Sequence, residues 1–383
     1  LILANLTQQL IQATDVLLMG GLGASQLAAA TLALNLTWTF SIFLLGLITA
    51  SSPMMATALG KRFNAVRDVR RTFRSGLWLI ALVMPPYWLL MWQVGGFMRS
   101  FGISEELARQ GETFLRAYMW LVAPWLLFQL LRNFVAALER PKVIFWLSIA
   151  GIALNALISW SLMFGHFGLP ALGLVGSGLG STITLIALCA ALIAFIAFDR
   201  EFGRFHWFGN WWRFDGQRML ALIELGWPIG ATMGLEIGVF ALAAFFMGWL
   251  GASAVAAHAI ALQLAALTFM VPLGLGQAAT VRVGLALGRK DNVGVMRAGW
   301  TAWLLGVLFM GTMALAMWSA PRPLVTLFLP DVPQDAAVPA LSVSFPRVDA
   351  AFPLVDVAQV IGAGMLRGLH VTRWPLIFAL VGY

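Results

Sequence analysis

The sequence predicts an all-α polytopic membrane protein built from two six-helix lobes that are related by a parallel repeat. Three observations predict this fold: a high apolar content, basic residues that alternate between loops, and two similar segments 228 residues apart. Of the 383 residues, 61% are hydrophobic and 10% are charged, whereas an average soluble domain has about 25% charged residues. Because a spanning helix needs about 20 apolar residues, this composition suffices for about eleven such helices and excludes a soluble globule.

Apolar stretches between polar breaks predict eleven spans along the chain. They lie near residues 1–20, 31–58, 76–98, 113–138, 142–165, 171–198, 221–249, 256–287, 298–320, 341–366 and 372–383. We expect a twelve-helix plan in which the eleventh helix is cut short at Tyr383 and the twelfth is absent from this chain. Prolines at 124, 228, 272 and 353 are compatible with spans, because neighbouring helices in a membrane bond the freed backbone groups.

Basic residues concentrate on one side of the predicted spans. Of the 24 lysines and arginines, 19 lie in or beside the loops that follow spans 2, 4, 6, 8 and 10. These are Lys61, Arg62, Arg67, Arg70, Arg71, Arg74, Arg132, Arg140, Lys142, Arg200, Arg204, Arg213, Arg218, Arg282, Arg289, Lys290, Arg297, Arg367 and Arg373. The positive-inside rule makes these loops and the N-terminus cytoplasmic, in a cell (inner) membrane. The net charge of +8 therefore indicates loops beside a bilayer rather than a nucleic-acid partner.

The second half of the chain repeats the first. Residues 19–64 align with residues 247–292 without a gap, and 19 of the 46 positions are identical. The offset covers six spans, an even number, so both copies enter the membrane in the same orientation, as in parallel-repeat transporters. We predict an N-terminal lobe at 1–198, a cytoplasmic interlobe linker at 199–219 and a C-terminal lobe at 220–383. Trp and Arg in the linker suit the headgroup level, although a plain flexible linker fits the same residues.

Three carboxylates fall well inside predicted spans: Asp15, Glu236 and Asp356. A charged side chain in the middle of a membrane costs about 2.5–3.5 kcal/mol on insertion scales, so each needs a cavity, a partner or a proton. The functional interpretation is that these acids bind the coupling cation or proton. The alternative is that each stays protonated and hydrogen-bonds between helices as a structural contact.

Polar amides accompany these acids. Asn5, Gln8, Gln12 and Asp15 share one face of a helix, and we expect this stripe to line water or the other lobe. The predicted polar lining of a substrate cavity consists of Gln8, Gln12, Asn35, Asn155, Gln263 and Gln359, although such amides also serve as contacts between membrane helices. The single cysteine, Cys189, excludes a disulfide framework. The four histidines show no metal-ligand spacing, so we expect no metal beyond Na⁺ at Glu236 and Asp356.

The charge pattern predicts the class of substrate. No basic residue lies near the centre of a predicted span, so a central cavity lined by the carboxylates should hold a negative potential and attract cations. This favours a lipophilic cation as the substrate and H⁺ or Na⁺ as the coupling ion, with no cofactor. We expect the protein to act in the lipid bilayer as a monomer.

Several motifs together resemble the multidrug and toxic compound extrusion (MATE) family, over essentially the whole chain. They are residues 14–20, 132–134, 139–141, 154–155 and 165–173 in the first half, and 224–230, 281–284, 287–288 and 356–368 in the second. The resemblance implies twelve helices in two lobes and an antiporter that exports cationic drugs against Na⁺ or H⁺ by alternating access. The acidic residues of the family in spans 1, 7 and 10 match Asp15, Glu236 and Asp356.

The resemblance also indicates a branch of the family. The damage-inducible branch carries an aspartate four positions after its span-5 asparagine, whereas Ser159 stands at that distance from Asn155 here. This points to the norfloxacin-efflux (NorM-like) branch. Ala259 follows His258 where members of the family often have Gln, so a side-chain contact at that position is not expected.

Three other classes of function fit the sequence less well. A flippase for lipid-linked saccharides on a related scaffold is the alternative, but its polyphosphate substrate requires arginines inside the cavity. A membrane enzyme requires a nucleophile–base pair or a His-rich metal site within the spans, so we expect no enzyme activity. A purely structural protein does not require three acids inside the membrane. The sequence leaves open the choice between Na⁺ and H⁺, the range of drugs, the oligomeric state and the activity of this chain on its own.

Overall fold

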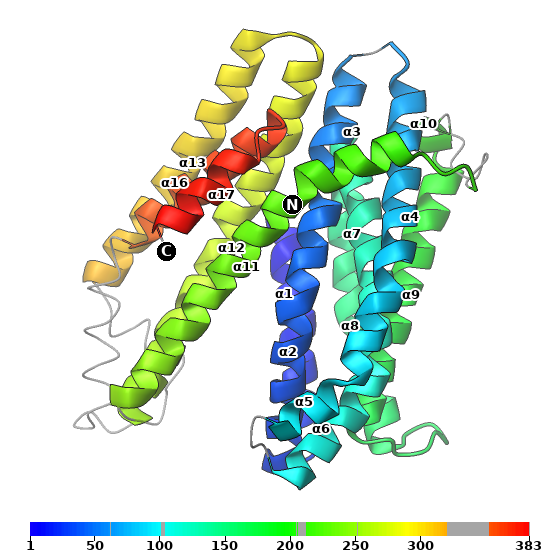
Figure 1. Cartoon of the computed structure of the whole chain (residues 1–383), viewed down its shortest axis with the longest axis vertical. Helices are drawn as coiled ribbons and strands as arrows, with labels where there is room; N and C mark the ends of the chain where they lie inside the picture. The colour runs from blue at the N-terminus through cyan, green and yellow to red at the C-terminus, as the bar shows by residue number, and fades with distance from the viewer. Residues whose placement is uncertain are drawn as a thin grey trace. The chain divides into compact units, whose positions relative to one another are not determined.

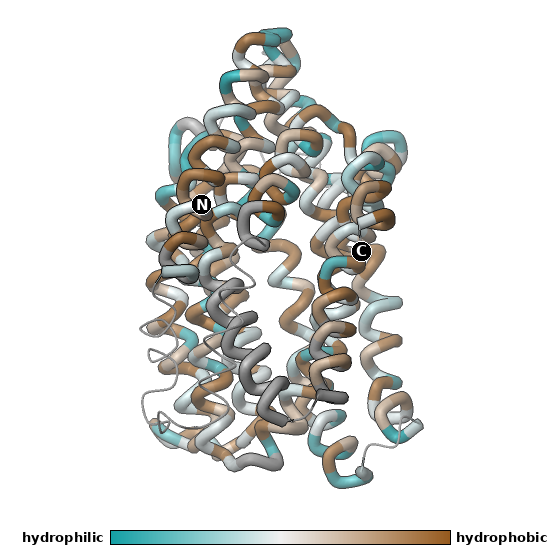
Figure 2. The backbone as a smooth tube through the Cα atoms, turned by 90° about the vertical axis from the view of Figure 1, so that its left-hand side faces the viewer, coloured by the Kyte–Doolittle hydropathy of each residue, from teal (hydrophilic) through white to brown (hydrophobic). Residues whose placement is uncertain are grey.

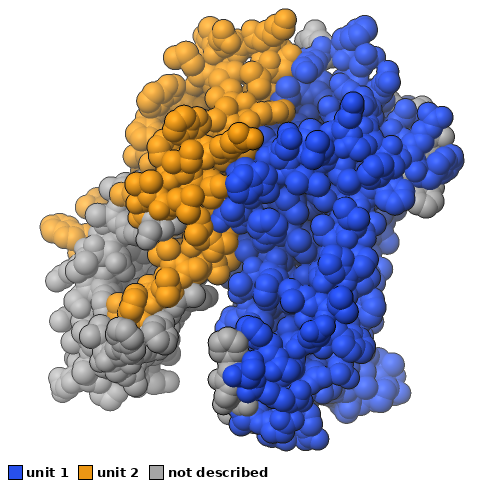
Figure 3. All heavy atoms as spheres, in the orientation of Figure 1, with its two compact units in different colours: residues 1, 3–231 blue, residues 2, 232–383 orange. Residues whose placement is uncertain are grey.

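The computed structural model describes residues 1–61, 63–100, 104–203, 205, 212–250, 252–319 and 352–382. Every regular element among these residues is a helix, which confirms the predicted all-α class (Figure 1). Contacts divide the chain into two compact units (Figure 3). Unit 1 contains residue 1 and residues 3–231, and unit 2 contains residue 2 and residues 232–383. The lobe boundaries at 198 and 220, with the linker between them, stay a prediction.

The helices of unit 1 follow one another through short connections. They are α1 (Ile2–Gly20), α2 (Ala24–Thr49), α3 (Ser51–Gly60), α4 (Ala65–Trp92), α5 (Val94–Ser100), α6 (Glu105–Tyr118), the 3₁₀ turn η1 (Met119–Leu121), α7 (Val122–Ala137), α8 (Lys142–Phe164), α9 (Leu174–Phe198) and α10 (Arg200–Gly203). Helix α11 (Gly216–Leu250) crosses the boundary between the units. Unit 2 continues with α12 (Ala252–Gly288), α13 (Asn292–Ser319), α16 (Phe352–Gly368) and α17 (Arg373–Gly382).

Eight segments of the described chain are long and apolar enough to cross a membrane, which agrees with a multi-pass membrane protein. They are Gln26–Gly60, Ala65–Trp92, Glu105–Ala137, Lys142–Phe164, Leu174–Phe198, Gly216–Phe240, Thr268–Gly288 and Asn292–Leu315. Hydrophobic positions run along the helices and hydrophilic ones gather near the turns (Figure 2). Helix α1 nearly has the predicted bounds, but its polar stripe lowers its mean hydropathy, so it is not among these eight segments. Part of the predicted span 341–366 lies outside the described residues.

Two predicted spans are interrupted at prolines. Span 31–58 is divided into α2 and α3 at Ala50, because Pro53 has no N–H to bond the carbonyl three to four residues earlier. Span 113–138 contains the 3₁₀ turn η1. Pro124 likewise has no N–H to bond the carbonyl of Trp120, which belongs to this turn. Hydropathy alone did not predict either interruption, since both sides remain apolar.

Small residues set the spacing of the helices that carry the candidate site. A Cβ added at Gly176 of α9 would lie 2.5 Å from the carbonyl oxygen of Leu162 in α8, and one at Gly180 would lie 2.6 Å from Oγ of Ser159. In unit 2, a Cβ at Gly364 of α16 would lie 2.5 Å from the carbonyl oxygen of Gly276 in α12. The backbones of α12 and α16 therefore approach closely at Gly364, whereas a Cβ at Gly362 would meet none of the described atoms within 4 Å.

Candidate functional site

Asp15 lies in the interior of unit 1 and accepts hydrogen bonds from two neighbouring helices. Asn155 Nδ2 of α8 donates to Asp15 Oδ1 at 2.6 Å, and Ser159 Oγ donates to the same oxygen at 3.5 Å. Ser181 Oγ of α9 donates to Asp15 Oδ2 at 2.8 Å. All four side chains are buried. We call these four residues the Asp15 cluster.

The Asp15 cluster can accommodate either charge state of its carboxyl group. Three neutral donors stabilise the ionised form, and within the described part of the chain no basic side chain is bonded to the carboxylate. Asn155 Oδ1 is buried and has no hydrogen-bond partner among the residues that the structure describes. Rotating the Asn155 amide by half a turn presents this oxygen as an acceptor for the proton of a neutral Asp15. The same pair of residues therefore suits a site that gains and loses a proton.

Asn5 and Gln8 of the α1 stripe accept hydrogen bonds from an arginine within unit 1. Arg132 of α7 is 5% exposed; it donates to Asn5 Oδ1, and its Nη1 donates to Gln8 Oε1 at 3.2 Å. The expectation that Asn5 and Asp15 line water or the other lobe is therefore wrong, because both are buried against helices of their own unit. The sequence pattern counts Arg132 with the basic residues of the loop after span 113–138, and the structure places it inside α7, bonded to α1.

Glu236 of α11 and Asp356 of α16 both lie in unit 2. Both are partly buried, and they lie within electrostatic range of one another. Arg367, one residue before the end of α16, lies within electrostatic range of Glu236. The predicted absence of a positive charge near these acids is therefore wrong. If both acids are ionised, the three side chains together carry one negative charge.

The weaker candidates lie in different surroundings. Gln12 of α1 and Gln359 of α16 are partly buried, and Gln359 is one turn after Asp356. Asn35 of α2 is exposed and belongs to neither group of acids. The side chain of Gln263 lies outside the described residues. Among the residues that are described, no group of three or more His, Cys, Asp or Glu side chains has a metal-binding arrangement.

Sequence reasoning missed Ser181, Arg132 and Arg367 as parts of these sites. Ser181 follows a run of glycines and serines in α9, which indicates helix packing and not a bond to an acid. Arg132 is six residues from the end of the predicted span 113–138, and long basic side chains near span ends usually reach toward the interface. One sequence does not show which helices pack against one another, so it gives no signal for the contact of Ser181 with Asp15 or of Arg132 with α1.

Known proteins resemble this chain over most of its length. The MatE family model matches residues 1–161 and 228–383. A "probable multidrug resistance protein NorM" of Mesorhizobium japonicum is 44% identical over 384 residues, covering 100% of this chain and 82% of that protein. A protein of the same name from Brucella suis is 42% identical over the same length, with the same coverage.

The fold also matches a solved structure. The outward-facing conformation of a multidrug resistance MATE family transporter of the MOP superfamily has a TM-score of 0.84 to this chain and 16% sequence identity. The match covers 99% of this chain and 82% of that one. At this identity the likeness concerns the fold alone, and the relationship at the level of sequence comes from the proteins that are more than 40% identical.

Proposed function

Because the chain belongs to the MatE family of multidrug and toxic compound extrusion transporters, we propose that it exports lipophilic cations in exchange for Na⁺ or H⁺. The family consists of multi-pass membrane transporters, so the protein is not an enzyme. The curated relatives carry the NorM name, which confirms the resemblance to the NorM-like branch. A multidrug substrate range is supported by those names. The bacterial origin of the relatives supports the inner membrane as its location.

The observation that carries the proposal is a pair of acidic sites with little or no compensating charge. Asp15 is bonded by three neutral groups, and in the second site Arg367 lies within electrostatic range of Glu236 while Asp356 interacts with Glu236. In a medium of low dielectric constant, an uncompensated carboxylate attracts a cation far more strongly than it does in water. Each site is therefore suited to take up one cation or proton and to release it again.

Exchange follows from competition for the same negative charge. In the proposed outward-open state, a cation at Glu236 and Asp356, or a proton at Asp15, neutralises the site and weakens the binding of a cationic drug. After the lobes change orientation, the ion leaves toward the cytoplasm and a drug molecule binds to the restored charge. A ligand shifts such an equilibrium only by its difference in affinity between the two states. The proposal needs no cofactor beyond the coupling ion, and a monomer with a cytoplasmic N-terminus suffices.

The test is drug uptake by inverted membrane vesicles under one imposed gradient at a time. Vesicles loaded with Na⁺ and diluted into Na⁺-free buffer at equal pH have a Na⁺ gradient only, and acid-loaded Na⁺-free vesicles have a proton gradient only. We expect at least one gradient to drive ethidium into the vesicle lumen above the level of vesicles without the protein. If the Na⁺ gradient alone has no effect, the proton is the coupling ion. Failure of both gradients would reject the antiport proposal.

A further inference from the structure

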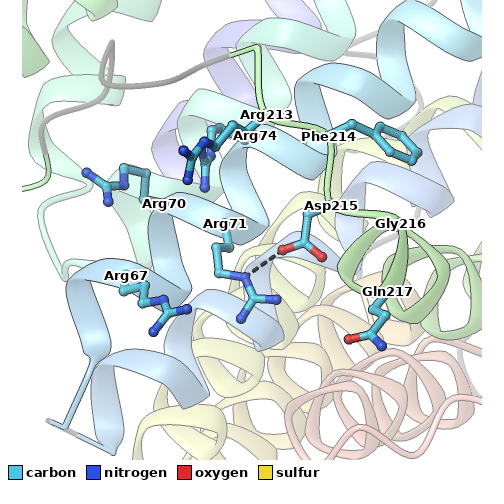
Figure 4. Close-up of a pocket in the computed structure, with 9 residues that line it drawn as sticks. All are labelled: Arg67, Arg70, Arg71, Arg74, Arg213, Phe214, Asp215, Gly216 and Gln217. Carbon is cyan, nitrogen blue, oxygen red and sulfur yellow. Dashed lines mark hydrogen bonds and ion pairs between the residues drawn. The ribbon is translucent and has the colours of Figure 1, made fainter.

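A cavity in unit 1, outside both acidic sites, is lined mainly by arginines. Its volume is about 400 Å³, and it lies between the first turns of α4 and the segment that leads into α11 (Figure 4). Five arginines, Arg67, Arg70, Arg71, Arg74 and Arg213, line it together with Asp215. We call this cavity the arginine pocket.

The arginine pocket collects its charge from two parts of the chain. Four arginines leave α4 at spacings of three, one and three residues, which places them along one face of the helix. Arg213 joins them from the segment before α11 (Figure 4). Arg74 is buried and lies within electrostatic range of Arg70, Arg71 and Arg213. Like charges at this separation repel one another, so a bound anion would stabilise the arrangement.

The one acid in the arginine pocket does not balance this charge. Asp215 Oδ2 accepts a hydrogen bond from Arg71 Nε at 2.5 Å, and Asp215 Oδ1 accepts one from the backbone N–H of Arg218 at 3.1 Å. The hydrogen bond from Arg71 holds the pKa of Asp215 below its usual value, so this side chain stays ionised at neutral pH. The pocket is lined by five guanidinium groups and one carboxylate, so four positive charges remain in excess.

A buried nitrogen supports an anionic ligand in the arginine pocket. Arg70 Nε is shielded from solvent and has no hydrogen-bond partner within the described structure. Leaving a buried donor of a charged group unsatisfied costs free energy. Guanidinium groups present their N–H donors in a planar fork that matches the oxygens of a phosphate group. Oxygen acceptors from such a group would satisfy Arg70 and neutralise its neighbours together.

Apolar side chains lie at the rim of the same pocket. Phe214 is 57% exposed, and its ring meets Trp78 of α4 edge to face, with the ring centroids 6.0 Å apart. Trp78 lies near the start of the apolar part of α4, which the sequence places at Gly76, so the arginines precede the membrane-spanning stretch. Aromatic rings beside basic residues at the end of a span are typical of the headgroup level of a bilayer.

We propose that the arginine pocket binds the phosphate group of an anionic lipid headgroup, and that this phosphate joins α4 to the start of α11. A free phosphate compound offers the same oxygens to the arginines but makes no use of the Phe214 and Trp78 rim. Basic pockets beside membrane helices bind phospholipid headgroups by the same chemistry. The binding does not depend on transport, so it can be tested separately from the exchange of drugs and ions.

The experiment measures lipid binding to the purified full chain by native mass spectrometry in detergent. Dioleoyl phosphatidylglycerol is titrated against dioleoyl phosphatidylcholine, and inorganic phosphate or pyrophosphate is added in a separate series. The triple variant Arg67→Gln, Arg70→Gln and Arg213→Gln is expected to weaken phosphatidylglycerol binding about a hundredfold. These positions spare Arg71, which is bonded to Asp215, and Arg74, which is buried.

A matched variant controls for total charge. Arg289→Gln, Lys290→Gln and Arg297→Gln remove three exposed basic residues from unit 2, on the side of the membrane that the sequence predicts for the pocket. This variant is expected to keep the affinity of the wild type within about threefold, because the attraction of separate surface charges is screened. If the glutamine variant of the pocket does not fold, a second variant with Arg67→Lys, Arg70→Lys and Arg213→Lys is used. It retains the positive charge but loses the planar guanidinium donors. Weaker phosphatidylglycerol binding in that variant also supports the proposal.

The source of the phosphate follows from the two titrations. Preference for phosphatidylglycerol over phosphatidylcholine, lost in the pocket variant, identifies a lipid headgroup. Pocket-dependent binding of pyrophosphate without any preference among the lipids identifies a soluble phosphate. Equal binding of every anion by the wild type and the pocket variant would overturn the proposal, whatever the outcome of the transport assays.

Discussion

Replacing Glu236 by Gln together with Asp356 by Asn is expected to abolish drug export. Both substitutions preserve the size of the side chain and remove its charge, so Glu236, Asp356 and Arg367 together would change from one net negative charge to one net positive charge. A site of that sign repels a cationic drug and a coupling cation alike. We expect the initial rate of ethidium efflux from cells to fall at least about tenfold, to the background of cells without the protein.

A carboxylate on the same helix provides the control for this loss. Glu224 lies about three turns before Glu236 in α11 and is exposed, so Glu224→Gln removes one negative charge from the same helix outside the acidic pair. The Glu224→Gln variant should export ethidium at the wild-type rate. The double variant should also reach the membrane in normal amounts, because removing charge from a span lowers the cost of insertion. Undiminished efflux in the double variant would reject the assigned roles of Glu236 and Asp356.

The substitution Asp15→Asn is expected to remove coupling with little change in the fold. An asparagine can place its amide oxygen where Oδ1 accepts from Asn155 and Ser159, and its amide nitrogen where it donates to the Ser181 hydroxyl. The hydrogen bonds of the cluster can thus persist while the titrating group is lost. We expect ethidium efflux to fall at least about tenfold and the thermal midpoint of the purified protein to stay close to that of the wild type.

Ser181→Ala separates the charge of Asp15 from its surroundings. This variant keeps the carboxylate and two of its three donors, and the lost hydrogen bond is worth about 1 kcal/mol, or about a fivefold change in an equilibrium constant. Efflux should therefore fall by no more than about that factor. The assignment of Asp15 as a coupling group fails if Asp15→Asn exports ethidium as fast as Ser181→Ala.

Hydropathy predicted the membrane segments well where the ends of a helix coincide with the ends of its apolar run. The predicted span 142–165 corresponds to α8 (Lys142–Phe164), which begins after Pro141 and ends at Gly165 with a φ of 77°. By contrast, α4 begins at Ala65, eleven residues before the predicted span 76–98. Hydropathy indicates where the apolar part of the helix begins. The helix itself begins earlier, and its first turns carry the four arginines that line the arginine pocket.

The acids were predictable from the sequence, but their partners were not. A carboxylate in an apolar stretch is unusual enough to identify Asp15, Glu236 and Asp356 singly. Its neighbours depend on how helices far apart in the sequence pack: Asn155 and Ser181 follow Asp15 by 140 and 166 residues. The position of Arg367 near Glu236 depends in the same way on the packing of α11 and α16. One sequence carries no direct record of such pairings.

The most direct test of competition for these carboxylates is the affinity of the purified protein for a cationic drug as Na⁺ and pH are varied separately. We predict that ethidium binds more weakly as the coupling ion rises, and that in a weakly buffered solution its binding releases that ion. Both effects should be lost in the protein with Glu236→Gln and Asp356→Asn. An affinity that stays constant across Na⁺ concentrations and across pH, with no ion released on binding, would contradict the proposed mechanism of exchange.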